Sequence, residues 1–279
     1  MRLWVGDCDD GELFDEDEAR VSVLDHGFTV ADGVFETLKV TREGAFALTR
    51  HLDRLTASAR SLGLAEPDSD IIRFAVDDVL AENRAEIGGL GRLRITYTAG
   101  RAPLGSDRGD ARPTLVVAVA AGTPWPDTTS IATVPWTRNE RSAVAGVKTT
   151  SYAENVVALA AAHAAGASEA VLANTAGALC EGTGTNVFVV VDGTVLTPPL
   201  SSGCLAGITR ELVLEWFGAK ETDLPLEVLQ EADEVFLTSS TRNVHPVVQA
   251  DQRSWSIAGP ISRDLRAAFD ERALRDIDP

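Results

Sequence analysis

The sequence is poor in positive charge. Its 279 residues include 25 lysines and arginines against 42 aspartates and glutamates, which gives a formal net charge of −17 at pH 7. A chain this acidic repels a phosphate backbone unless a local basic patch intervenes, and the sequence contains no such patch. The composition therefore predicts a soluble protein and excludes nucleic acid as an expected partner.

Cysteine and long apolar runs are also scarce. The three cysteines, Cys8, Cys180 and Cys204, are irregularly spaced and form no metal-binding motif, so we expect free thiols and no bound metal. The N-terminal segment lacks a basic stretch followed by an apolar run, and no later segment resembles a membrane span. These absences predict a cytoplasmic protein that does not enter a membrane.

The first half of the chain mixes strand and helix patterns. Two stretches alternate in the manner of strands, and two others carry apolar residues at helical spacing. Two β-branched runs bounded by glycine and proline predict a pair of neighbouring strands. In chain order, the six ranges are 21–24, 34–40, 51–62, 71–83, 93–98 and 114–120.

The second half favours a sheet or barrel with helices packed outside. Residues 121–128 are rich in proline and small polar residues, which predicts a linker between a small domain, 1–120, and a larger one, 129–279. An alanine-rich helix is expected first, followed by short strands between turns. The predicted helix is 151–165 and the predicted strands are 169–172, 187–191 and 195–196. The whole pattern predicts an α+β protein.

A further helix is expected after a glycine-containing loop, with Thr209 as its N-cap. The start of a helix presents free backbone N–H groups, which bind anions. This segment is therefore a candidate phosphate site.

Lysine occurs at three positions, Lys39, Lys148 and Lys220. Lys148 lies in an otherwise uncharged stretch just before the predicted helix. An amine held partly out of water can lose its charge, attack an aldehyde and later carry a proton. The alternative is an ordinary surface lysine. A serine or cysteine hydrolase finds little support, because there is no GxSxG motif and the four histidines are scattered.

Five motifs in order resemble those of the class IV aminotransferases, the fold-type IV pyridoxal-phosphate enzymes. They are DHGFTVADGVFETLKV with HLDRL, AGVKTTSYAEN, LCEGTGTNVFVV, GITR and LTSSTRNVHPV. The resemblance implies a two-domain fold with a small N-terminal domain and a larger C-terminal domain built on a barrel-like sheet. It also implies pyridoxal 5′-phosphate as cofactor, amino acids and 2-oxo acids as substrates, and a homodimer.

The same resemblance assigns roles to individual residues. Lys148 would bind the cofactor aldehyde, Glu181 would partner the pyridine nitrogen, Asn186 would orient neighbours, and Tyr152 would bind the phenolate oxygen. The expected phosphate ligands are Arg54, Ile208, Thr209 and Thr241. For four of these residues a role outside the cofactor site remains the alternative. Glu181 could cap a turn, Asn186 could stabilise a turn, Arg54 could lie in solvent, and Tyr152 could serve packing alone.

The resemblance also implies a substrate pocket, for which the candidates are Phe35, Glu36, Arg94, Arg101 and Arg242. Arg94 falls where branched-chain enzymes keep an arginine, and Ala99 falls where D-amino-acid transaminases keep the arginine that binds the carboxylate. Another arginine of the set could replace it. We expect a ping-pong transaminase, acting on a D-amino acid. The alternatives are an aminodeoxychorismate lyase, which the TAGRAPLGSDRG loop resembles, and a branched-chain L-amino-acid aminotransferase.

Overall fold

The computed structural model describes residues 1–7 and 9–279, so the cysteine at position 8 lies outside the described residues. The chain forms two compact units, and the passage from Pro124 to Trp125 falls inside the predicted linker. The first unit comprises 1–124, 147–151 and 277–279, and the second comprises 125–146 and 152–276. The segment 147–151 was expected in the larger domain, but it belongs to the first unit because its backbone bonds to a strand there.

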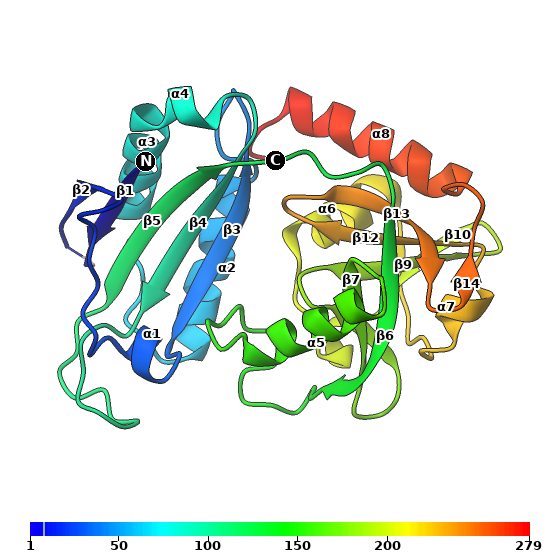
Figure 1. Cartoon of the computed structure of the whole chain (residues 1–279), viewed down its shortest axis with the longest axis horizontal. Coiled ribbons are helices and arrows are strands. Elements are labelled where there is room, and N and C mark those ends of the chain that lie inside the picture. The colour runs from blue at the N-terminus through cyan, green and yellow to red at the C-terminus, as the bar shows by residue number, and fades with distance from the viewer. Residues whose placement is uncertain (8) are drawn as a thin grey trace. The chain divides into compact units, whose positions relative to one another are not determined.

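The first unit contains, among its described residues, a five-stranded antiparallel sheet in the order β2-β1-β5-β4-β3. Helices α2 and α3 lie on one face of this sheet (Figure 1). The strands are β1 (Arg2–Gly6), β2 (Gly11–Asp15), β3 (Gly33–Val40), β4 (Gly91–Thr98) and β5 (Thr114–Ala121). The helices are α1 (His26–Thr29), α2 (Leu48–Ser61), α3 (Ser69–Glu82) and α4 (Arg84–Ile87).

The core of the first unit forms because β3 and α2 each bury one apolar set. Val34 and Leu38 of β3 pack with Leu52 and Leu55 of α2, and all four are at most 2% exposed. Full burial of such side chains contributes about 1.5–3 kcal/mol each. Because β3 is the last strand in the sheet order, its outer edge can bind a further segment.

The predicted strand at 21–24 is wrong. These residues form a loop and turn, in which Asp25 N donates to Ser22 O, and Val23 is 74% exposed. The local alternation had no neighbouring strand to pair with. Strands β1 and β2 were not predicted.

The second unit contains, within the described part of the chain, a mixed nine-stranded sheet in the order β11-β10-β9-β12-β13-β6-β7-β8, with β14 beside β13. Helix α5 packs on β6 and β7, while α8 packs along β13 and β12 (Figure 1). The strands are β6 (Thr129–Arg138), β7 (Glu169–Asn174), β8 (Leu179–Gly182), β9 (Asn186–Val191), β10 (Thr194–Thr197), β11 (Lys220–Glu221), β12 (Glu234–Ser239), β13 (Asn243–Ala250) and β14 (Arg253–Ser254). The helices are α5 (Ala153–Ala164), η1 (Leu200–Ser202), α6 (Ile208–Phe217), α7 (Val228–Glu231) and α8 (Pro260–Arg275).

The predicted start of α6 is shifted by two residues. Gly207, not Thr209, is the N-cap, and no side chain caps the helix. The predicted helix 151–165 and strands 169–172, 187–191 and 195–196 correspond to α5, β7, β9 and β10. The α+β class is confirmed. Cys180 and Cys204 are free and buried, and no helix in the described ranges is long and apolar enough to cross a membrane.

Candidate active site

In the first unit, the segment that carries Lys148 is bound to the outer edge of β3. Phe35 N donates to Lys148 O at 3.0 Å, and Thr150 N donates to Gly33 O at 2.8 Å. Val34 and Thr149 are the paired residues of this short antiparallel bridge. The ammonium of Lys148 lies 4.6 Å from the centre of the Phe35 ring, in a half-buried position. The sheet therefore fixes the backbone on both sides of the lysine.

Arg94 shares the Phe35 ring with Lys148. It projects from β4, where it pairs with Thr37 of β3, and its guanidinium carbon lies 3.4 Å from the ring centre. Its Nε donates to Thr96 Oγ1 at 3.2 Å. A planar guanidinium stacks well on an aromatic face. The structure thus brings three of the predicted site residues together.

Arg54 and Glu36 form a buried ion pair in the same unit. Arg54 Nε and Nη2 donate to the two oxygens of Glu36, at 2.8 and 2.6 Å, and His51 Nδ1 lies 2.6 Å from Glu36 Oε2. Burial alone would raise the pKa of Glu36, but Arg54 and His51 hold it well below its ordinary value. Burial is also the main cause that lowers the pKa of His51.

This environment differs from the one expected for Glu36. Its side chain is 0% exposed and both oxygens are engaged, so it offers no surface to a substrate. Its carboxylate instead fixes the guanidinium plane of Arg54. His51 is the first residue of the HLDRL motif but was not predicted as a site residue, although its position three residues before Arg54 on one helix places the two side chains on the same face.

In the second unit, Glu181 lies on β8 with its carboxylate held from two sides. Leu205 N donates to Oε2 at 2.8 Å, and Arg138 Nε lies 3.0 Å from Oε1. Arg138, at the end of β6, also donates through Nη2 to Asn155 Oδ1 at 3.0 Å. A guanidinium at this distance favours the ionised carboxylate. Arg138 was not predicted, because it lies far from Glu181 in sequence.

Asn186 shapes the approach to α6. Its Nδ2 donates to Leu205 O at 2.9 Å, and its Oδ1 packs against Gly207, where a Cβ would come within 2.0 Å. A side chain at position 207 would therefore displace the amide of Asn186. The helix then begins with Ile208 and Thr209, both 3% exposed, whose N–H groups face the N-terminal end of the helix.

The hydroxyl of Tyr152 donates to Thr183 O at 3.1 Å, and Asn155 Nδ2 donates to the same carbonyl at 2.7 Å. Burial raises the pKa of Tyr152, so its hydroxyl stays protonated. Thr183 belongs to the loop that follows Glu181. The structure thus joins Tyr152 to this loop within the second unit.

The remaining substrate candidates have different surroundings. Arg242 donates to Glu169 at 3.2 Å and stacks on Trp125 at 4.1 Å, with 7% of its side chain exposed. Thr241, the residue before it, is half-buried. Arg101 is exposed in the loop after β4. Of the three predicted arginines, Arg101 is therefore the one on the surface.

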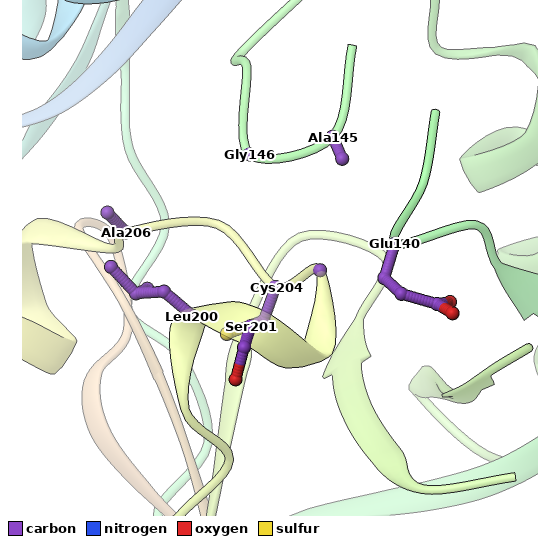
Figure 2. A pocket seen from close by; sticks show the side chains of 8 residues that line it. Glu140, Ala145, Gly146, Leu200, Ser201, Cys204 and Ala206 are labelled. Carbon is purple, nitrogen blue, oxygen red and sulfur yellow. The ribbon is translucent and has the colours of Figure 1, made fainter. Parts of the chain in front are cut away.

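A cavity of about 280 Å³ borders the loop that holds Glu181. Apart from Glu140, its walls come from Ala145, Gly146, Leu200, Ser201, Gly203, Cys204 and Ala206, most of which are small (Figure 2). Glu140 also lines it, but its Oε1 accepts from Thr175 Oγ1 at 2.6 Å. Burial raises the pKa of the Cys204 thiol, so this wall is uncharged.

Comparison with known families identifies the group of residues around Lys148 in the first unit and the group around Glu181 in the second. The model of the family described as amino-transferase class IV matches residues 33–250. The chain belongs to the class IV aminotransferases. It is therefore an enzyme that transfers amino groups, and its cofactor is pyridoxal 5′-phosphate. The match includes both the Lys148 segment and the loop of Glu181.

Individual relatives divide between two substrate classes. The chain is 33% identical over 272 residues to a provisional branched-chain-amino-acid aminotransferase of Methanocaldococcus jannaschii, covering 93% of each chain. It is 29% identical over 298 residues to a D-alanine aminotransferase of Listeria innocua, covering 99% of this chain and 97% of that one. A solved structure of a hypothetical aminotransferase from Mycobacterium tuberculosis in its pyridoxal-phosphate form matches with a TM-score of 0.85 and 29% identity, covering 98% and 99%.

The described residues of the class IV aminotransferase fit this cofactor. An aldehyde requires an amine, and the first unit fixes Lys148 by the backbone bonds to β3. A protonated pyridine nitrogen requires an anion, and Glu181 is held beside Arg138. A phosphate requires N–H and hydroxyl donors, and the uncapped start of α6 with Thr209 offers both.

Proposed function

We propose that this aminotransferase transfers the amino group of a small D-amino acid to a 2-oxo acid. The observation that carries its chemistry is the backbone bridge between Lys148 and β3, which fixes a half-buried lysine beside an aromatic ring. The bound cofactor supplies an electron sink for the charge left at the substrate Cα. The chain's own residues then bind, orient and move protons around it.

Lys148 is the proposed base that takes the Cα proton and returns it. Glu181, whose Oε1 lies 3.0 Å from Arg138 Nε, would be the partner of the cofactor's ring nitrogen. The proposed phosphate ligands are Arg54, oriented by Glu36 in the first unit, and Ile208, Thr209 and Thr241 in the second unit. Asn186 keeps the loop before α6 in place, and Tyr152 orders the loop after Glu181.

Arg101 is the proposed partner of the substrate carboxylate. It lies two positions beyond Ala99, on the same loop, and its side chain is exposed. Arg94 is stacked on Phe35, and Arg242 is paired with Glu169, so both are more constrained. The D-alanine aminotransferases among the relatives support the D-amino-acid assignment. We also propose a homodimer acting in the cytoplasm.

The lysine assignment is tested by replacing Lys148 with alanine. We expect the visible absorption of the protein-bound cofactor to disappear and turnover to fall by at least a thousandfold, because the amine is both the attachment point and the proton carrier. Lys220→Ala is the matched control, since Lys220 is exposed on β11, and it should keep both properties. A Lys148→Ala protein with wild-type turnover would refute the assignment.

The substrate class is tested by adding D-alanine, L-leucine or aminodeoxychorismate separately to the purified enzyme. D-Alanine should bleach the visible band, and Arg101→Gln should raise the KM for D-alanine about tenfold, the loss of one charged hydrogen bond. Bleaching by L-leucine alone would make it a branched-chain enzyme. Pyruvate release from aminodeoxychorismate, with the band unchanged by both amino acids, would make it a lyase.

A further inference from the structure

The turn before β3 contains two features that the proposed cofactor chemistry leaves unexplained. Ala31 has a left-handed backbone conformation with a φ of 57°, which is unfavourable for residues other than glycine because of the Cβ atom. The carboxylate of Asp32 accepts from Arg108 Nε and Nη2, each at 2.7 Å. A strained turn persists where its surroundings over-determine it, and this bidentate ion pair is one such constraint.

Arg108 joins this turn to two other elements of the first unit. Its Nη2 and Nη1 donate to Leu62 O and Gly63 O, both at 2.8 Å, just beyond the end of α2. Arg108 itself belongs to the loop between β4 and β5. The hydrogen bonds from Arg108 hold the pKa of Asp32 below its ordinary value, so the pair stays charged at neutral pH. One guanidinium therefore fixes three segments at once.

The Lys148 segment binds the same turn on both sides of Asp32. Thr150 Oγ1 donates to Ala31 O at 2.8 Å, and Thr150 N donates to Gly33 O at 2.8 Å. These two carbonyls belong to the residues that flank Asp32. A displacement of Asp32 therefore moves the acceptors that hold the chain two residues after Lys148.

We propose that the Asp32–Arg108 pair is the positioning device for Lys148. It acts through the strained turn and Thr150, and Arg108 is a positioning residue rather than a catalytic one. The proposal rests on the proposed role of Lys148. It explains Asp32, the residue before β3, and Arg108 of the loop between β4 and β5, which the cofactor chemistry does not use.

The first test measures backbone hydrogen exchange by mass spectrometry on the cofactor-free protein. Arg108→Gln should speed exchange in peptides that contain Lys148 to Thr150 about tenfold, because their acceptors on the turn lose their support. Arg60→Gln is the matched control: Arg60 lies near the same end of α2, but it pairs with exposed Glu66. Unchanged exchange in Arg108→Gln would overturn the proposal.

The second test follows attachment of added pyridoxal 5′-phosphate to Lys148, with borohydride trapping and identification of the labelled peptide. Attachment should be about tenfold slower than wild type in Arg108→Gln and in Asp32→Asn. The double variant should be no slower than either single variant, because each single change already breaks the same ion pair. A double variant in which the two slowing factors multiply would overturn the proposal. So would a variant in which the Lys148 segment exchanges faster while cofactor attachment keeps its wild-type rate.

Folding and function are controlled separately. If Arg108→Gln does not fold, Asp32→Asn supplies both measurements, and Arg108→Lys should give an intermediate rate because it keeps the charge without the bidentate geometry. If the wild-type protein attaches no cofactor at Lys148, the proposed function fails. The exchange measurement still decides whether the pair holds the segment.

Discussion

Two residues that were not predicted as site residues, His51 and Arg138, contribute to the electrostatics of the candidate site. His51 and Arg138 each contact a carboxylate whose importance the sequence did indicate. Glu36 is fixed between His51 and Arg54, so it orients a cation. Glu181 has one oxygen on a backbone N–H and the other beside a guanidinium. At this scale, function depends on which partner each carboxylate has.

Replacing Arg138 with glutamine should weaken binding of pyridoxal 5′-phosphate about tenfold. The change removes the guanidinium 3.0 Å from Glu181, so the carboxylate loses the charged partner that holds one of its oxygens in place. Fluorescence titration of the cofactor-free protein measures the affinity. Arg141→Gln serves as control, because the side chain of Arg141 is 89% exposed. Equal affinity in Arg138→Gln and wild type would show that Glu181 does not need this partner.

At the scale of elements, strand β13 carries a histidine that should make stability depend on pH. His245 is buried, its Nε2 donates to Pro126 O at 2.9 Å, and burial lowers its pKa to about 4, with Arg242 adding to the effect. In the unfolded chain the imidazole of this histidine has its ordinary pKa, about 6.5. Between these values the unfolded state binds the extra proton, so the free energy of unfolding falls as the pH falls.

The expected loss between pH 6.5 and pH 4.5 is about 2 kcal/mol for this histidine. His245→Gln keeps a donor for Pro126 O but cannot titrate, so its stability should fall by that much less over the same range. Urea unfolding at the two pH values measures the difference. His51 contributes in the same direction in both proteins and cancels. Parallel pH profiles of variant and wild type would contradict the prediction.

At the scale of the whole molecule, exposed apolar side chains of the first unit support the proposed homodimer. Val23, Phe28 and Leu104 are 74%, 77% and 78% exposed. Their segments are adjacent, since Ala102 N donates to Leu24 O at 3.2 Å. Exposed apolar side chains on neighbouring segments are typical of an interaction surface.

Light scattering should therefore give a mass of twice 29.6 kDa, about 59 kDa, for the wild-type protein. Phe28→Asp should shift the mass toward that of one chain, because a charge in a buried contact is costly. Phe74→Asp is the control: Phe74 is 60% exposed on α3 of the same unit. A wild-type mass of 29.6 kDa would refute the homodimer.

Local patterns predicted some of the regular elements and missed others, among them the long strands β6 and β13 and the helix α8. The helical spacing at 51–62 and 71–83 corresponds to α2 and α3, because one face of each helix enters the core. The alternation at 21–24 did not form a strand, since sheet pairing requires a partner that local sequence does not reveal. Strand β8, which carries Glu181, was missed because it is four residues long and buried throughout.

The sequence by itself determined the family, the cofactor and the residue types of the chemistry. The motifs that carry them are short, contiguous stretches in a fixed order, so each can be recognised without knowledge of its spatial neighbours. Tertiary structure decided which residues touch. Residues 147–151 bind to β3, and the Asp32–Arg108 pair joins residues 76 positions apart. Glu36 is buried by segments that are distant in the sequence. Such contacts depend on sheet edges and packing, and no local pattern encodes them.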